Sequence, residues 1–537
     1  MKCFILSLVI LPFISVYSQI IFVSPDNNVY DFLSSLSIKG IISFNDEIKP
    51  LSRDYISGKI YELESKKNYL TGIEVEELDF YAKEYFLELK KFSKVKLETV
   101  TSFFNFNDEK RFRVFTYYDS LFSISADPVF GYDLKSFSIK NHSWNGVNLL
   151  GSIGSNVGFN LNFRDNHVSN INDGLLNKFS NTTGIAFFTS NDYDEVNGNL
   201  AYSWNWGDFS LGKDYFVWGS GKSGQIILSE NAPSFPFIKL NVYPVSWLDF
   251  TYFHGLLISG VIDSNSIRIN KNPTRIHSDL VEKYMVAHIL TVRPYSNLNI
   301  SLGESVIYSD RFQPIYLIPM LFFRLVDHYQ NFTDANGGNA QLFSNISYKN
   351  SYLNTKFYTT LFIDELTLTK YLKGIDAPKA VAYTVGTIII DPGIKDVSFN
   401  LEYTKLDPDV YFHEDDAQLY TNYRYQMGHW IGSNGDQVHF SVTKKILRGL
   451  NLLVSYDYIR KGHTPQLGEL LYQPGQNFLF GLRTNYRLIN TLISYELIND
   501  FFIKVGFNWE KIDKELTSGN FNTINDNYLT FSINYGF

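Results

Sequence analysis

Cysteine is almost absent from this sequence, and the single residue, Cys3, lies next to its N-terminal end. The rest of the 537-residue chain can therefore form no disulfide, no cysteine-based metal site and no thiol nucleophile. No apolar run reaches the roughly 20 residues that a membrane-spanning helix needs, and no linker rich in Pro, Gly and Ser divides the chain. These absences exclude a disulfide-stabilised scaffold and a helical membrane protein.

A basic surface is also missing. The chain carries 47 Lys and Arg against 55 Asp and Glu, a formal net charge of -8, and neither end has a charged tail. Nucleic-acid binding requires a surface rich in Lys and Arg, because contacts with the phosphate backbone dominate the affinity. We therefore expect no nucleic-acid partner.

Aromatic residues, in contrast, are abundant. They make up 17% of the chain, with 45 Phe, 37 Tyr and 7 Trp, whereas Met is rare at 4. A membrane β-barrel combines aromatic girdles at its two interfaces with a polar lumen, and it needs no long apolar run. The composition therefore favours a transmembrane barrel over the alternative, an aromatic-rich soluble β-protein.

Residues 1–18 have the organisation of a secretory signal peptide. Lys2 gives a positive start, an apolar stretch covers residues 4–16, and compact residues precede Gln19. The apolar stretch is too short for the alternative, an N-terminal membrane anchor. We expect the signal peptide to be cleaved before Gln19.

A spacing of three or four between apolar residues predicts short helices over residues 19–93. Ser52 can cap the second helix, and Thr71 with Glu74 forms a capping box before the third. Because short helices with narrow apolar stripes are marginal alone in water, we expect them to form a periplasmic helical bundle. The stripes are Val29, Leu33 and Leu36, then Ile56, Ile60 and Leu63, then Leu78, Ala82, Tyr85 and Leu89.

Residues 94–537 change to a period of two, the period of β-strands. Apolar residues alternate with small or polar ones over residues 157–164, 297–302 and 399–404. A soluble core would not tolerate the polar face, whereas a wet lumen requires it. At roughly 24 residues per strand with its turns and loops, the region holds about eighteen strands, with sixteen or twenty as alternatives. We predict a membrane all-β protein, an eighteen-stranded antiparallel outer-membrane β-barrel with a small N-terminal α-helical bundle.

The last predicted strand has one aromatic face and one polar face. Leu529, Phe531, Ile533, Tyr535 and Phe537 alternate with Thr, Ser, Asn and Gly. We expect the apolar face to meet lipid. A strand that stops on a terminal aromatic resembles the signal by which the outer-membrane insertion machinery recognises its clients.

Five segments of the mature chain carry recognisable motifs: Gly212–Gly219, Gly224–Pro236, Ile48–Arg53, Gly303–Tyr308 and Leu361–Glu365. Together they resemble those of the Wzi capsule-assembly family, and the resemblance covers nearly all of the mature chain. It implies a periplasmic helical bundle followed by an eighteen-stranded barrel with a crowded, charged lumen, and a lectin that holds exported capsular polysaccharide at the cell surface. The loops depart from the family, for example at residues 411–420, so the resemblance implies the fold more directly than the sugar.

Charged side chains in strand-like segments are candidates for the lumen, because a lipid-facing charge costs about 2–4 kcal/mol near the bilayer midplane. We expect an inward salt-bridge network, or a surface that guides a polar glycan, from Lys213, Glu304, Arg311, Asp364, Glu365, Glu402, Asp457 and Arg460. Trp144, Trp218 and Trp430 are either girdle residues or stacking platforms for sugars. The candidate glycan-binding or lumen-network residues are Lys213, Trp218, Ser229, Asn231, Glu304, Arg311, Asp364 and Glu365.

Motifs for catalysis or cofactor binding are not present. The histidines form no HExxH, and no GxSxG occurs. The densest group of ligand-type side chains, at residues 413–416, could hold calcium. A solvated acidic loop is favoured instead, because the group has no glycine at its turn and no regular alternation of ligands. We expect no cofactor, no metal and no catalytic residue, with a hydrolase built from distant residues as an alternative.

These patterns predict a monomeric, non-enzymatic protein of a Gram-negative outer membrane that assembles or retains capsular or surface polysaccharide. Its expected partners are that polysaccharide, outer-membrane lipid and polysaccharide export machinery. A porin or substrate-selective channel is the main alternative. Paired charges of both signs with an inserted segment would indicate a plug, whereas charges of one sign along a constriction would indicate a channel.

Overall fold

The computed structural model describes residues 20–92, 98–106, 111–136, 140–169, 192–269, 276–327, 337–364, 380–423, 425–464, 476–517 and 519–536. The predicted signal peptide, Glu365 and Phe537 lie outside these described residues.

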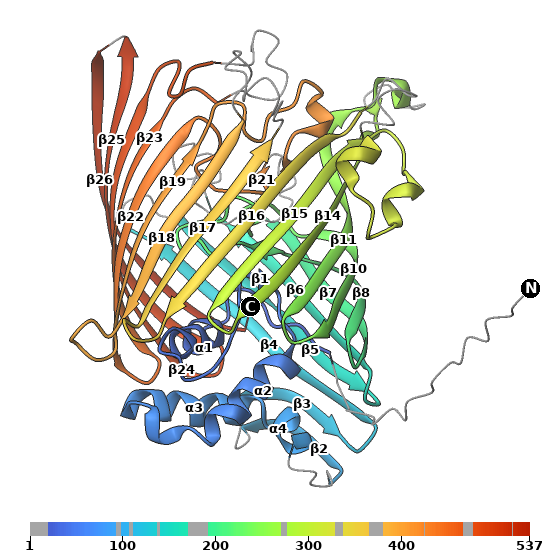
Figure 1. Ribbon diagram of the computed structural model, residues 1–537, viewed down its shortest axis with the longest axis vertical. Coiled ribbons are helices and arrows are strands. Elements are labelled where there is room, and N and C mark those ends of the chain that lie inside the picture. The colour runs from blue at the N-terminus through green and yellow to red at the C-terminus, as the bar shows by residue number, and fades with distance from the viewer. Residues whose placement is uncertain are drawn as a thin grey trace, which may run out of the picture.

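Within the described residues, eighteen antiparallel strands close into a barrel, which confirms the predicted fold (Figure 1). Each strand pairs with the next one in the chain, and β26 pairs with β4 to close the ring. The strands are β4 (Phe122–Lys135), β5 (Lys140–Ile153), β6 (Val157–Val168), β7 (Asp192–Trp204), β8 (Gly207–Asp214), β10 (Phe235–Val245), β11 (Leu248–Ile262), β14 (Leu280–Tyr295), β15 (Leu298–Ser309), β16 (Asn339–Asn350), β17 (Thr355–Asp364), β18 (Val381–Ile390), β19 (Val397–Leu406), β22 (Gly435–Leu447), β23 (Leu450–Lys461), β24 (Thr484–Ile498), β25 (Phe501–Thr517) and β26 (Asn520–Tyr535).

Several shorter strands lie outside the ring. A hairpin of β2 (Val100–Phe106) and β3 (Phe112–Tyr118) extends the sheet beside the closing seam. It does so because β3 pairs with residues 123–126 of β4, whereas β26 pairs with residues 130–135. The other short strands pair as β1 (Ile48–Lys49) with β9 (Val217–Trp218), β12 (Arg268–Ile269) with β13 (Ile276–His277), and β20 (Thr421–Asn422) with β21 (Tyr425–Gln426).

The N-terminal region contains four α-helices gathered at one end of the barrel (Figure 1). They are α1 (Val29–Ile38), α2 (Arg53–Glu64), α3 (Gly72–Glu84) and α4 (Phe86–Phe92), with a short 3-10 helix, η1 (Lys67–Tyr69), between α2 and α3. Three other 3-10 helices lie in connections between barrel strands: η2 (Ser264–Ser266), η3 (Pro314–Leu317) and η4 (Asp416–Gln418). The Ser52 cap and the capping box of Thr71 with Glu74 both form as predicted. The region is not helical throughout, because residues 48–49 form β1 inside the barrel.

The polarity of the barrel follows from its connections. The strand connections at the helical end are mostly tight, such as residues 205–206 and 246–247, whereas residues 215–234 and 407–434 connect strands at the other end. Outer-membrane barrels have short periplasmic turns and longer extracellular loops. The helices therefore lie at the periplasmic end. No helix in the described ranges is long and apolar enough to cross a membrane.

The strands alternate between a lipid-facing and a lumen-facing side. On β15, Leu302 is 61% exposed on the outside, whereas Asn299 and Ser301 are buried inside. This matches the predicted period of two. The final strand is an exception at its end, because Tyr535 is covered and not lipid-exposed as expected. The β2–β3 hairpin reaches over it, and the hydroxyl of Tyr535 donates to the carbonyl of Phe112 at 2.6 Å.

Candidate functional site in the barrel lumen

The connection between β8 and β10, residues 215–234, folds back into the lumen. Its strand β9 pairs with β1 of the N-terminal region, and Trp218 lies opposite Ile48. Trp218 is fully buried, and Phe216 stacks on Phe253 of the barrel wall with 4.5 Å between ring centroids. The two segments enter from opposite ends of the barrel and meet inside it.

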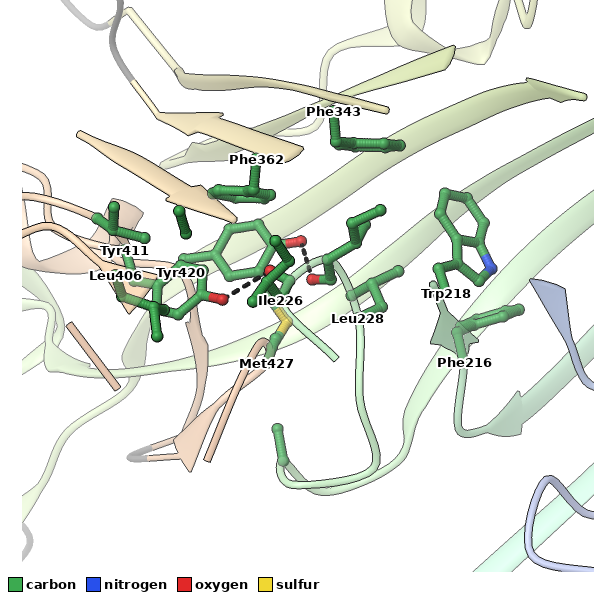
Figure 2. Close-up of a cluster of buried hydrophobic side chains, with 14 of the residues drawn as sticks. Phe216, Trp218, Ile226, Leu228, Phe343, Phe362, Leu406, Tyr411, Tyr420 and Met427 are labelled. Atoms are coloured by element: carbon green, nitrogen blue, oxygen red, sulfur yellow. Dashed lines mark hydrogen bonds between the residues drawn. The ribbon is translucent and has the colours of Figure 1, made fainter. Parts of the chain in front are cut away.

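A second extracellular connection, residues 407–434, covers the first. The buried hydroxyl of Tyr411 donates to the carbonyl of Ile226 at 2.6 Å, and that of Tyr420 donates to the carbonyl of Ile227 at 2.8 Å. Figure 2 shows both bonds, with the tyrosine rings packed beside the buried hydrophobic cluster. The two loops therefore lock together, and with β1 they form the structure that we call the plug.

Ser229 and Asn231, two of the predicted site residues, form part of the contact between the two plug loops. The hydroxyl of Ser229 donates to the carbonyl of Gly428 at 2.6 Å, and the side-chain amide of Asn231 donates to the carbonyl of Gln426 at 3.0 Å. Both side chains therefore hold one plug loop to the other.

Glu402 of β19 anchors the tip of the first plug loop. One carboxylate oxygen accepts from the backbone N–H of Lys222 at 2.8 Å and from the hydroxyl of Tyr358 at 2.6 Å. The other accepts from the backbone N–H of Ser223 at 3.2 Å. Glu402 is almost completely buried, as the inward prediction required, and its role is to hold the plug against the wall.

Asp364 also faces inward, as predicted, whereas Glu304 lies on the outer face of β15, two residues after the lipid-facing Leu302, so its predicted inward orientation was wrong. Each of the two carboxylates holds a loop. Glu304 accepts from the backbone N–H of Phe323 at 2.5 Å and lies 3.2 Å from Nε2 of His288. Asp364 accepts from the backbone N–H of Tyr411 at 2.7 Å. Each carboxylate accepts a hydrogen bond from a backbone N–H group of an extracellular loop. A buried N–H group needs such a partner, because it has lost its contact with water.

Two other charged residues do not point inward, so their predicted orientation was wrong. Lys213 follows the exposed Leu211 at a spacing of two on the outer face of β8, and its ammonium donates to the carbonyl of Val196 at 2.8 Å. Arg460 is on the outer face of β23 and pairs with Asp436. Both lie at the ends of their strands, where a long side chain reaches the polar interface and the cost of a lipid-facing charge falls.

The remaining charged candidates divide between loop and wall. Arg311 is exposed in the loop after β15 and is not on a strand. Asp457 faces the lumen and accepts from the amide of Gln437 and from Nδ1 of His439, both at 2.7 Å. Glu365 lies outside the described residues.

The three tryptophans occupy different places. Trp218 is a core residue of the plug, so it is neither a girdle residue nor a stacking platform at the surface. Trp430 lies in the second plug loop, where its indole N–H donates to the carbonyl of Ser223 at 2.6 Å. Trp144 lies opposite Gly131 on the inner face of the wall. Only Trp144 lies on the barrel wall facing the lumen.

A buried ionic cluster connects residues 46–47 of the N-terminal segment to strands β15 and β17 of the barrel wall. Lys356 of β17 lies 3.6 Å from Glu47 and 3.9 Å from Asp46, and Asn299 donates to Glu47 at 3.0 Å. Burial raises the pKa of Asp46, but the lysines around it outweigh this effect and hold that pKa well below its usual value. We did not predict these residues from the sequence, because residues 46–47 were assigned to a helical region.

The inward carboxylates Glu402 and Asp364 therefore hold inserted chain segments, and Lys356 pairs with Glu47 and Asp46 where the N-terminal segment meets the wall. This is the arrangement expected of a plug and not of a selective constriction.

The acidic group at residues 413–416 is used locally. Asp415 accepts from the backbone N–H of Ala417 at 2.9 Å and caps η4, while Nδ1 of His413 accepts from the backbone N–H of Asp415 at 3.1 Å. Within the described ranges, no three His, Cys, Asp or Glu side chains are grouped as metal ligands.

The comparisons with known proteins agree with this architecture. The capsule assembly protein Wzi family matches residues 104–525. Among solved structures, the chain is similar to Wzi of Escherichia coli, described as an outer-membrane, carbohydrate-binding β-barrel involved in group 1 capsule assembly. The two share 13% identity with a TM-score of 0.60, over 96% of this chain and 99% of that one.

Two further solved structures are less similar. OprD of Pseudomonas aeruginosa has 11% identity and a TM-score of 0.42, over 77% of this chain and 92% of that one. OccAB2 of Acinetobacter baumannii has 10% identity and a TM-score of 0.42, over 77% and 97%. No functionally curated protein matches the chain in sequence. With most of its length matched by one family and its strands closed into a barrel of this type, the chain belongs to the Wzi family of capsule assembly proteins of the Gram-negative outer membrane.

Proposed function

We propose that this protein retains capsular or surface polysaccharide at the outer membrane by lectin-like binding, without catalysing a reaction. Family membership over residues 104–525 supports a role in capsule assembly. A polymer with repeating sugars can be held by many weak contacts, because each further contact forms at high effective concentration.

The observation that carries the proposal is the locked plug. Tyr411 and Tyr420 hold one extracellular loop to the other, and β9 holds the first loop to β1. A passive pore needs an open path, whereas a surface anchor benefits from a lumen filled by ordered segments. The plug therefore favours retention over the alternative function of a porin.

We further propose that the helices offer the periplasmic surface on which polysaccharide export machinery docks. Two tyrosines of this region are exposed, Tyr69 at 76% and Tyr61 at 50%. Aromatic side chains of this kind are enriched at protein interfaces. The barrel itself would act as a monomer surrounded by outer-membrane lipid.

The test is a deletion strain complemented with the wild-type gene. Cell-attached and released polysaccharide are measured separately and normalised to folded protein. We expect the deletion to move polysaccharide from the attached to the released fraction with unchanged chain length. An unchanged distribution would refute the proposal, shortened chains would indicate a hydrolase, and steady conductance of the purified protein in planar bilayers would indicate a porin.

A further inference from the structure

The inner faces of β6 and β7 carry a compact group of asparagines around the middle of the barrel height. Asn160 lies directly opposite Asn199, and Asn162 directly opposite Asn197. Directly opposed residues have Cβ atoms about 5 Å apart, so the four amides form one continuous patch. Arg164 continues it by one step toward the extracellular rim. We call these five residues the asparagine wall.

The asparagine wall has unused hydrogen-bonding capacity. The side-chain amide of Asn197 donates to Glu195 at 3.4 Å, and that of Asn199 donates to Asp214 at 2.8 Å. Their Oδ1 atoms have no hydrogen-bond partner, although Asn197 is only 8% exposed. The same is true of Oδ1 of Asn160 and Nε of Arg164. Leaving buried polar atoms unpaired is unfavourable, so a partner that supplies both donors and acceptors would be stabilised here.

An aromatic shelf adjoins the wall on its extracellular side. Trp144 on β5 lies directly opposite Asn166 on β6, and Asn166 lies directly opposite Tyr193 on β7. The indole lies flat over Gly131, since a Cβ added to that glycine would come within 2.1 Å of the ring. Its Nε1 has no hydrogen-bond partner. One face of the indole is therefore covered by Gly131. The register places Trp144 two residues beyond Arg164 and four to six residues, about 13–20 Å along the strands, from the asparagines of β6.

The geometry points to a glycan-binding site made of the asparagine wall and Trp144. A sugar hydroxyl both donates and accepts hydrogen bonds, so it can satisfy an asparagine Oδ1 and an arginine Nε at once. The aromatic face suits the apolar side of a sugar ring. This assignment rests on the proposed function and locates it: the polysaccharide enters the extracellular mouth and lies on the β5–β7 side of the lumen.

A lumen filled only with water is the competing explanation of the unpaired atoms. Asn241, another lumen-facing asparagine three strands farther along the chain, differs from the wall. Its amide donates to Asp208 and its Oδ1 accepts from Thr251, both at 2.9 Å. An inward asparagine in this barrel can thus be satisfied by its neighbours. In the wall, the amide oxygens of Asn160, Asn197 and Asn199 have no hydrogen-bond partner. With the indole two residues beyond Arg164, the wall has the composition of an extended ligand site.

The test uses full-length mature protein in nanodiscs and an array of defined bacterial surface oligosaccharides. The strongest wild-type binder is then titrated against Asn197→Ala/Asn199→Ala, Trp144→Phe and the control Asn241→Ala. We expect at least a tenfold weaker Kd for the double variant and an unchanged Kd for the control. Binding should also shift the tryptophan fluorescence of the wild type but not of Trp144→Phe. Resistance of each variant to heat and SDS verifies folding.

Each outcome has a distinct meaning. If the wild type binds oligosaccharide and the double variant binds equally well, this site is wrong while the retention function stands. If a folded wild type binds no oligosaccharide and the deletion strain retains its polysaccharide normally, the proposed function fails and this site fails with it. Equal weakening by the control and the double variant would show a general effect on the barrel and would also refute the assignment.

Discussion

Arg111 donates from Nε to a carboxylate oxygen of Glu84 at 2.8 Å and so joins the end of α3 to the hairpin beside the barrel seam. The same guanidinium reaches Asp127 of β4 at 3.2 Å and Asp500 in the turn before β25. All four side chains are buried. One arginine therefore connects the helices, the hairpin and two barrel strands at the periplasmic end.

Replacing Glu84 should loosen the helices. In Glu84→Gln, Arg111 and Arg53 lose a buried charge partner, and breaking a buried ion pair costs on the order of 3–5 kcal/mol. We expect much faster hydrogen exchange in α2 and α3 of the reconstituted protein, with the barrel strands unchanged. Glu64→Gln is the control, because Glu64 pairs only with the half-exposed Lys67 at the surface. Equal exchange in both variants would contradict the role of Glu84.

The same carboxylate should make the helices acid-sensitive. Burial alone raises the pKa of Glu84, but Arg111 and Arg53 outweigh it and lower that pKa to about 2. Because the folded pKa lies below the unfolded value of about 4.3, the stabilisation is complete above pH 4.3 and is lost as the pH falls toward 2. An acid titration followed by circular dichroism should show this transition, and Glu84→Gln should lack its contribution. A wild-type profile that stays flat over this range would refute the prediction.

Glu402 should control how firmly the plug is seated. Glu402→Gln weakens the acceptor for the backbone N–H groups of Lys222 and Ser223. We expect intermittent conductance in planar bilayers, absent from the wild type, because the loop tip leaves the wall more often. Glu282→Gln, which alters an exposed carboxylate bonded to Tyr284 on β14, should behave as the wild type. Identical traces for both variants would show that Glu402 does not hold the plug.

Trp218 should act through stability. Trp218→Ala removes a fully buried side chain from the plug core and should cost on the order of 3–5 kcal/mol. We expect a lower heat-modification temperature and retention unchanged per folded molecule. Trp206→Ala, in an exposed periplasmic turn, should have a much smaller effect. Lower polysaccharide retention by Trp218→Ala at an equal amount of folded protein would instead assign Trp218 to the binding site.

Ile60 tests the independence of the helices from barrel insertion. Ile60 is fully buried among the helices, so Ile60→Asp places an uncompensated charge in their core. We expect protease sensitivity in residues 53–92 with normal outer-membrane abundance of the barrel. Tyr61→Asp, on the exposed side of the same helix, should remain resistant. Loss of barrel insertion in Ile60→Asp would show that the helices are integral to the barrel.

Local pattern alone determined much of this fold. The caps at Ser52 and Thr71 could be predicted because they depend on residues three positions apart. The alternation around Leu302 predicted a barrel strand, and the chain length available per strand predicted eighteen of them. The outward position of Lys213 could also have been predicted from the sequence, since it continues the series Phe209 and Leu211. The inward prediction was wrong because it applied the midplane cost of a lipid-facing charge to a residue at the end of a strand.

The candidate site was decided by tertiary structure. Tyr411 meets Ile226 across 185 positions, and Glu402 meets Lys222 across 180. No periodicity within a segment can encode which loop turns back into a lumen, because that choice depends on the space left by all the strands and on the polar atoms they leave unpaired. The sequence specified two-faced strands and capped helices through neighbouring residues. Only closure of the barrel brought the plug loops together and set four asparagines on the same inner wall as Trp144, because those contacts form between strands and not along them.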